Sequence, residues 1–106
     1  MTTSKAKHAR ARKFLQNLAG GPLTLGSLLS AIREGEGMTQ AEFADKLGVS
    51  RSHLCDIEKG RKTVGPARAA RFAAILGHSP ESFVALALQA QVQAAGLKLT
   101  VTVTAA

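Results

Sequence analysis

The sequence predicts an all-α fold of five helices, followed by a single strand near the C-terminus. Between residues 23 and 95, apolar side chains recur with the period of roughly 3.6 residues that is typical of helices burying one face. Capping residues, prolines and glycines divide this stretch into five segments of helical length. Residues 97–104 instead alternate apolar and polar side chains, which indicates a half-buried strand.

The first two helices have clear end signals. The first runs from about Leu23 to Gly35. The second has Thr39 as its N-cap and Glu42 at the spacing of a capping box, and it ends at Gly48, which tolerates a positive φ. The side chains expected to face inward from these two helices are Leu25, Leu28, Leu29, Ile32, Phe43, Ala44 and Leu47.

Three further helices are expected over residues 50–60, 65–76 and 79–95. The third begins at a serine cap and ends at a glycine. The fourth begins at a Gly-Pro pair. The fifth begins at Ser-Pro-Glu, where a cap, a proline in the first helical position and a first-turn acid coincide.

The predicted strand lacks a partner within its own chain. A lone strand is not stable, and the fifth helix is apolar over more surface than four small helices can cover. Both elements are satisfied when two chains pair them across a two-fold axis. The alternative is a strand folded over its own helical core. We expect a homodimer, with the apolar side of the strand formed by Leu97, Leu99, Val101 and Val103.

The chain is strongly basic, with 14 Lys and Arg against 7 Asp and Glu, a net charge of +7. Residues 1–33 contain six of the bases and no acid. This surplus favours a polyanionic partner, although charge alone fits RNA or a membrane surface equally well. For residues 1–22, an arm that touches the DNA backbone and a solvated tail both stay open.

Several functional classes are not expected. Cys55 is the single cysteine, and its spacing to His8, His53 and His78 matches no zinc pattern, so we expect no metal and no cofactor. No nucleophile–base pair or phosphate-binding loop indicates an enzyme. The most apolar window, residues 82–97, contains three glutamines and is shorter than the roughly 20 residues of a membrane span. We therefore expect no membrane contact and a cytoplasmic location.

Residues 39–60 have the pattern of two crossed helices joined by a tight turn. The crossing needs a small residue, which is Ala44, and the turn needs a residue that adopts the left-handed conformation, which is Gly48. The second helix directs Leu54 and Ile57 to one side. Its other side carries Arg51 at the flank with Ser52, Cys55, Asp56 and Lys59.

This segment resembles the helix-turn-helix of the lambda-repressor/Cro (Xre-type) family, and the resemblance covers roughly residues 23–88. It implies a lambda-repressor-like domain that binds double-stranded DNA and places the second helix of the helix-turn-helix in the major groove. For a dimer the operator would be pseudo-palindromic, with half-sites about 34 Å apart. The signature positions filled without a gap are Thr39-Gln40, Phe43-Ala44, Gly48-Val49-Ser50, Leu54, Ile57-Glu58 and Gly60.

The resemblance also implies roles for single residues. Arg51, Ser52 and Asp56 would face base edges, with Arg51 the candidate for a bidentate bond to guanine. Asp56 departs from the family's usual amide or basic residue, and it could accept from a cytosine amino group or repel phosphate. Arg33 and Glu58 would form a structural ion pair. The residues expected to contact the DNA backbone are Thr39, Gln40, His53, Lys59, Arg61 and Lys62.

The expected organisation is a basic arm over residues 1–22, a helix-turn-helix domain over 23–79 and a dimerisation element over 80–106. Two functions fit it. The first is a stand-alone transcriptional regulator, a repressor. The alternative is the antitoxin of a type II toxin–antitoxin pair, in which a small Xre-type protein represses its own operon and binds a toxin. The chain's size and its terminal strand resemble such antitoxins.

Overall fold

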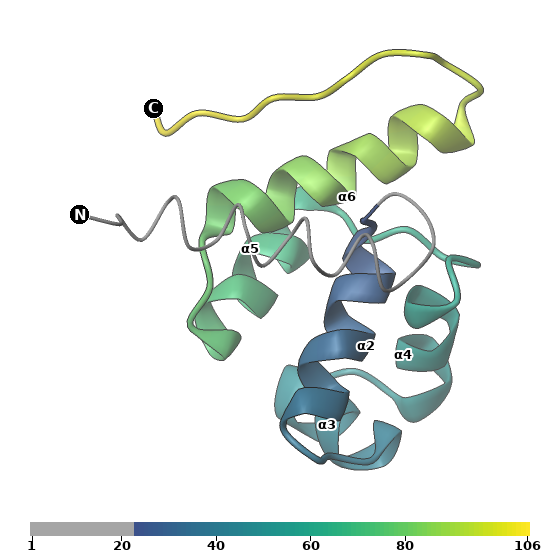
Figure 1. Ribbon diagram of the computed structural model, residues 1–106, viewed down its shortest axis with the longest axis vertical. Helices are drawn as coiled ribbons and strands as arrows, with labels where there is room; N and C mark the ends of the chain where they lie inside the picture. Colours follow the sequence, from purple (N-terminus) through teal and green to yellow (C-terminus); the bar gives the residue numbers. More distant parts are fainter. Residues whose placement is uncertain (1–22) are drawn as a thin grey trace.

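Five helices, α2 to α6, form the folded part of residues 23–106, the part of the chain that the computed structural model describes (Figure 1). The five predicted helices are thus confirmed. The basic arm predicted over residues 1–22 lies outside the described residues. The helix bounds are α2 Leu25–Gly35, α3 Gln40–Leu47, α4 Arg51–Glu58, α5 Pro66–Leu76 and α6 Pro80–Ala94.

Local capping signals fix where the helices begin. The Thr39 hydroxyl accepts a hydrogen bond from the Glu42 backbone at 3.1 Å, and the Glu42 carboxylate accepts one from the Thr39 backbone at 3.0 Å. The predicted capping box is therefore present. The Ser50 hydroxyl caps α4 by accepting a hydrogen bond from the His53 backbone at 3.1 Å. Helix α2 begins two residues later than predicted, because Thr24 and Ser27 form a second capping box with serine in place of the usual Glu or Gln.

One hydrophobic core joins all five helices. Each helix contributes one of its largest fully buried side chains, which are Leu29, Phe43, Leu54, Phe72 and Phe83. Helices α5 and α6 pack along each other, while α2 and α3 both pack against α4 (Figure 1). The core therefore supports α4 from behind and leaves its other side facing outward.

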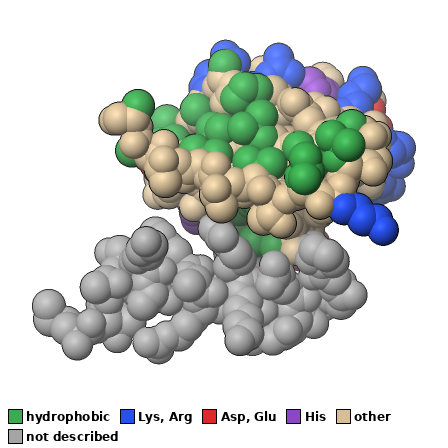
Figure 2. All heavy atoms as spheres, turned by 90° about the horizontal axis from the view of Figure 1, so that it is seen from above, with side chains coloured by type: hydrophobic (Ala, Val, Ile, Leu, Met, Phe, Trp, Pro, Cys, Tyr) green, Lys and Arg blue, Asp and Glu red, His purple; other side chains and the backbone are tan. Residues whose placement is uncertain are grey.

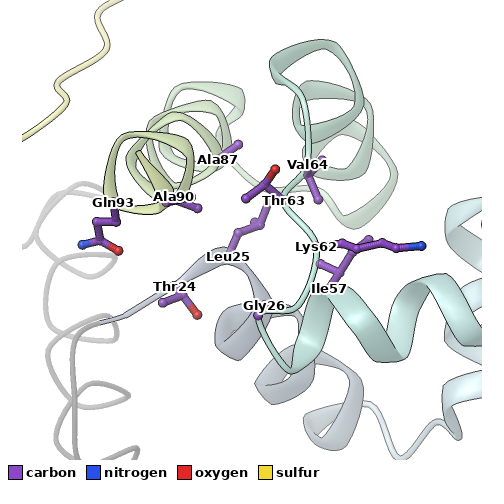
Figure 3. Close-up of a pocket in the computed structure, with 12 residues that line it drawn as sticks. Thr24, Leu25, Gly26, Ile57, Lys62, Thr63, Val64, Ala87, Ala90 and Gln93 are labelled. Carbon is purple, nitrogen blue, oxygen red and sulfur yellow. The ribbon is translucent and has the colours of Figure 1, made fainter. Parts of the chain in front are cut away.

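Gly26 allows the first turn of α2 to approach the end of α4. It is buried, and a Cβ at this position would overlap the carbonyl oxygen of Ile57 and lie 3.0 Å from that of Glu58. Figure 3 shows Gly26 in the first turn of α2, beside the end of α4. Both carbonyl oxygens belong to the backbone, so neither can rotate away as a side chain would.

The chain turns back after Gly96 and runs extended along α6 (Figure 1). The side-chain amide of Gln89 holds this tail, donating to the Leu99 carbonyl and accepting from the Val101 N–H, both at 2.8 Å. The predicted strand is not formed, and no strand occurs anywhere in residues 23–106. The physical reason is that the tail lies beside a helix whose backbone groups are already paired, so one side-chain amide supplies what a neighbouring strand would.

The tail covers α6 only in part. Val101 and Val103 are half-buried, whereas Leu97 and Leu99 are 51% and 61% exposed. Figure 2 looks onto this side of the molecule and shows hydrophobic side chains grouped in the middle, with Lys and Arg toward the margins. None of the helices within residues 23–106 is long and apolar enough to cross a membrane.

We expect Gly26→Ala to destabilise the protein. The added methyl group must displace backbone at the end of α4, and overpacking of this kind costs about 1–3 kcal/mol. Gly35→Ala is the matched control, because a Cβ there meets nothing within 4 Å. Urea unfolding followed by circular dichroism measures both. Equal stabilities of the two variants would contradict the close helix approach.

Candidate nucleic-acid interface

Helices α3 and α4 form a helix-turn-helix. The turn consists of Gly48, Val49 and Ser50, and Gly48 has a φ of 75°, which lies in the left-handed region. The Val49 N–H donates to the carbonyl of Ala44 at 3.0 Å and closes the turn. Ala44 is buried on the inner side of α3. The small side chain and the left-handed glycine that the sequence placed here therefore do what a tight helix crossing requires.

A part-buried ion pair ties α2 to α4 beneath this surface. Arg33 donates through Nε to Glu58 Oε2 at 2.9 Å and through Nη2 to Oε1 at 3.2 Å, which is a bidentate pairing. The side chains are only 16% and 5% exposed. The hydrogen bond that Arg33 donates to Glu58 raises the pKa of Arg33. The contact that the family resemblance implied between these two residues is present in the structure.

Two further hydrogen bonds extend the pair. Arg33 Nη1 donates to the carbonyl of Met38, in the loop between α2 and α3, at 3.2 Å. The Gln40 side-chain nitrogen donates to Glu58 Oε1 at 3.1 Å. One carboxylate therefore receives donors from α2 and α3 while it sits on α4, and the three helices share one polar junction.

The first turn of α4 presents polar side chains to solvent. Arg51 and Ser52 are exposed, and neither side chain has a hydrogen-bond or ion-pair partner within residues 23–106. His53 is half-buried beside them, and Lys59, the C-cap residue of α4, is exposed. Donors held on a rigid helix and left without internal partners are available to an external ligand.

The N-terminus of α3 offers backbone amides more than side chains. The Thr39 hydroxyl accepts the capping-box bond, and the bond from the Thr39 backbone lowers the pKa of Glu42. The Gln40 side chain turns inward to Glu58. A phosphate contact by Gln40 would consequently rest on its backbone N–H, since the first amides of a helix lack internal partners and attract anions.

The chain after α4 folds back over the end of that helix. The backbone N–H groups of Arg61 and Lys62 both donate to the Asp56 carbonyl, at 2.8 and 3.2 Å. The Arg61 Nε donates to Asp56 Oδ1 at 2.8 Å, and the Lys62 Nζ lies 3.6 Å from Oδ2. The bond from Arg61 is the main cause of a lowered pKa for Asp56. Two residues expected to bind phosphate thus hold an internal carboxylate.

A profile of the helix-turn-helix domain matches residues 24–86, which is more than half of the chain. The chain belongs to this helix-turn-helix family. Searches of curated proteins and of solved structures found no match. In helix-turn-helix proteins the second helix of the motif enters the major groove, and in this family member that helix is α4. Membership indicates a DNA-binding regulator, from a class of domains that is typically not enzymatic.

The structure also contains a pocket of about 320 Å³ between the start of α2, the α4–α5 loop and α6 (Figure 3). Small and apolar side chains line most of it, including Leu25, Val64 and Ala87. Lys62 is the one charged residue among the described residues that line it, and Figure 3 shows its side chain pointing away from the pocket. Since no charged groups converge there, the helix-turn-helix surface is the stronger candidate site.

Two features of this surface were missed from the sequence. The inward turn of Gln40 depends on where Glu58 lies in three dimensions, and no local pattern announces it. The contacts of Asp56 had a signal in the sequence. Asp56 lies one turn before Gly60, the glycine that ends the helix, and two bases follow that glycine directly. Gly60, with a φ of 75°, reverses the chain and brings those bases back to the acid.

We expect Arg33→Ala to destabilise the fold strongly. It leaves the Glu58 carboxylate, which is only 5% exposed, without a counter-charge, and breaking such a pair costs up to roughly 3–5 kcal/mol. Replacing Arg33 and Glu58 together by apolar residues should recover much of that loss, because no unpaired charge remains buried. Urea unfolding of the single and double variants measures both effects.

Glu36→Ala supplies the matched control for this experiment. Glu36 pairs with Lys46 at 3.3 Å, but both side chains are more than one-third exposed. An exposed pair contributes about 0–1 kcal/mol, so this variant should lose little stability. Equal losses of stability for Arg33→Ala and Glu36→Ala would show that the Arg33–Glu58 pair stabilises the fold no more than an exposed ion pair does.

Proposed function

We propose that the protein is a sequence-specific transcriptional regulator, a repressor, that reads the major groove with α4. The observation that carries this proposal is the contrast between the two faces of α4. Leu54 and Ile57 are buried, and Glu58 is locked by Arg33, while Arg51 and Ser52 stand exposed in the first turn. A rigid helix with donors at its N-terminal end suits base recognition.

The proposal divides the exposed residues by role. Arg51 reads a guanine through a bidentate contact and Ser52 contacts a neighbouring base edge. Lys59 and His53 bind phosphates on either side of α4, and the backbone N–H of Gln40 at the start of α3 binds a third phosphate. The phosphate contacts fix the register of the protein on DNA without reading its sequence.

We also propose that the regulator acts as a homodimer through its C-terminal tail. Gln89 binds the side of the tail on which the Leu99 carbonyl and Val101 N–H lie. In an extended chain, backbone groups of alternate residues point to opposite sides, so those of Thr100 and Thr102 face away from Gln89. An unpaired extended edge is a template for a strand from a second chain.

The location of the tail suits such a dimer. In Figure 1, α6 and the tail lie at one end of the molecule. Helix α3 lies at the opposite end, and α4 lies next to it, away from the tail. Pairing of two tails therefore leaves α4 of each protomer uncovered. The exposed side chains of Leu97 and Leu99 would be covered at the same time.

A second candidate function uses the same edge for a different partner. In the antitoxin reading, the tail binds a toxin, while the helix-turn-helix represses the operon that encodes both proteins. The exposed Leu97 and Leu99 favour a protein partner of either kind. Co-purification of the chain with the product of a neighbouring gene tests this reading directly.

Arg51→Ala should alter which sequences are bound. Loss of a bidentate base contact costs about 1–3 kcal/mol on the preferred site and relaxes one position in each half-site. Selection of binding sites from a random duplex library, done for the wild type and the variant, measures the change. A variant that keeps the full wild-type consensus would sink the assignment of Arg51.

Lys59→Ala serves as the comparison for Arg51→Ala. If Lys59 binds phosphate, its loss weakens binding to all sequences alike and lowers the salt dependence of log K by about one ion. The consensus should stay as in the wild type. A changed consensus for Lys59→Ala would mean that the division into base and backbone contacts is drawn wrongly.

Truncation after Gly96 should shift the protein from dimer to monomer. It removes the edge and all four apolar side chains of the tail. Operator affinity should fall steeply, whereas weak non-specific binding remains, because one helix-turn-helix still meets phosphate. Analytical ultracentrifugation and binding titrations measure the two effects. A truncated chain that stays dimeric would assign the interface to α6 alone.

Thr102→Pro tests the tail edge more sharply than truncation does. Proline removes the N–H that the outer edge offers, tolerates an extended backbone and leaves the Gln89 bonds in place. We expect this variant to lose the dimer while its helical content and melting curve stay unchanged. A Thr102→Pro dimer as tight as the wild type would exclude strand pairing along this edge.

A further inference from the structure

We propose that Asp56 is an internal substitute for a DNA phosphate, and that it limits binding of the protein to DNA of any sequence. This inference rests on the proposed function. It assigns Asp56 a role different from reading a base. The carboxylate keeps Arg61 and Lys62 occupied and in place until a DNA phosphate takes its position.

The geometry of the carboxylate carries the first step. Oδ1 accepts from Arg61 Nε at 2.8 Å, and Oδ2 lies 3.6 Å from Lys62 Nζ, so each oxygen already faces a cation. A base-reading acid needs an oxygen directed into the groove, toward a cytosine amino group. The Asp56 side chain is 26% exposed, against 56% for Arg61 and 60% for Lys62. The two bases therefore form the outer layer and the acid lies beneath them.

The backbone supplies the second step. The carbonyl of Asp56 accepts from the N–H groups of Arg61 and Lys62. The same residue thus anchors the main chain and the side chains of the loop that follows α4. This loop is held even when its ionic contacts exchange, so a phosphate can replace the carboxylate without refolding the loop.

Energetics decide whether such an exchange is possible. A solvent-accessible ion pair of this kind contributes little stability, because water and salt screen it. A DNA phosphate can therefore displace the carboxylate at small cost. The displaced carboxylate still lies beside the DNA and repels it. Both effects are independent of base sequence, so they lower affinity for every duplex by the same factor.

A uniform reduction of affinity is useful to a regulator of this kind. Non-specific sites in a genome greatly outnumber the operator, and phosphate contacts supply nearly all of the binding to them. An acid that weakens two of these contacts shortens the time spent on wrong sites. Arg51 and Ser52 in the first turn of α4 are untouched by Asp56 and keep the choice of sequence.

The test compares Asp56→Asn with Asp45→Asn. Both variants raise the net charge by one, but Asp45 is exposed on α3 and has no ion-pair partner within residues 23–106. Each variant and the wild type are titrated against two fluorescent duplexes over a range of salt concentrations. One duplex has random sequence, and the other has the sequence that the wild type selects from a random library.

We expect Asp56→Asn to bind both duplexes more tightly by the same factor. The variant regains the full strength of a phosphate contact that Asp56 weakens in the wild type, so the salt slope should steepen by up to about 0.9, which corresponds to at most about eightfold tighter binding at ~0.1 M salt. Asp45→Asn should change the affinity much less. The consensus selected by Asp56→Asn should match that of the wild type.

A double-mutant cycle gives a second measurement. It compares the effect of Arg61→Gln on DNA binding with and without Asp56, so a change in stability caused by Asp56→Asn alone does not decide the result. Arg61→Gln should weaken binding less in the wild type, where Asp56 competes with the phosphate for the guanidinium, than in the Asp56→Asn background. Equal losses in the two backgrounds would overturn the proposal.

The remaining outcomes separate the proposal from its alternatives. A changed consensus and weaker binding of the selected duplex by Asp56→Asn would make Asp56 a base-reading residue and overturn the proposal. Equal effects of Asp56→Asn and Asp45→Asn would show that the gain in affinity comes from the net charge alone, and this would overturn the proposal as well. Wild-type protein that binds neither duplex would instead contradict the proposed function, and the wild-type titration alone decides this.

Discussion

The polar junction around Glu58 is the interaction on which the rest of the helix-turn-helix depends. Helix α4 has eight residues, and a helix of that length is not stable by itself in water. Its inner face supplies only Leu54 and Ile57 to the core. The bidentate bond from Arg33 and the bond from Gln40 add fixed, directional contacts to α2 and α3. The rotation of α4 about its own axis is thereby set, and with it the direction of Arg51.

The two acids of α4 have opposite relations to the exposed surface. Glu58 faces inward and is satisfied by α2 and α3, whereas Asp56 faces the loop after the helix and is satisfied by Arg61 and Lys62. Each carboxylate is therefore balanced by cations of the same chain. An unbalanced acid on a DNA-facing helix would repel phosphate at long range. With both balanced, the exposed part of α4 is dominated by donors.

The helices were predictable because their signals are local. The Thr39 and Glu42 pair, and the Ser50 cap, each act within one turn, so their spacing in the sequence determines their contact. The Arg33–Glu58 pair was reached through family resemblance. Gly26 was not foreseen, because its need for a missing Cβ arises only when α4 arrives against α2. The bonds of Gln89 were missed for the same reason, since alternation in the tail indicates an extended chain but not its neighbour.

The tail shows how one sequence pattern can satisfy two arrangements. Alternating side chains require an extended backbone, and an extended backbone has two hydrogen-bonding sides. In the single chain, Gln89 binds one side at two points, and Val101 and Val103 are half-buried. The other side stays open, together with most of Leu97 and Leu99. Attachment to α6 therefore orders the tail without consuming the edge that a second chain would use. Because the tail is already extended, a partner strand would find part of the ordering cost removed before it binds.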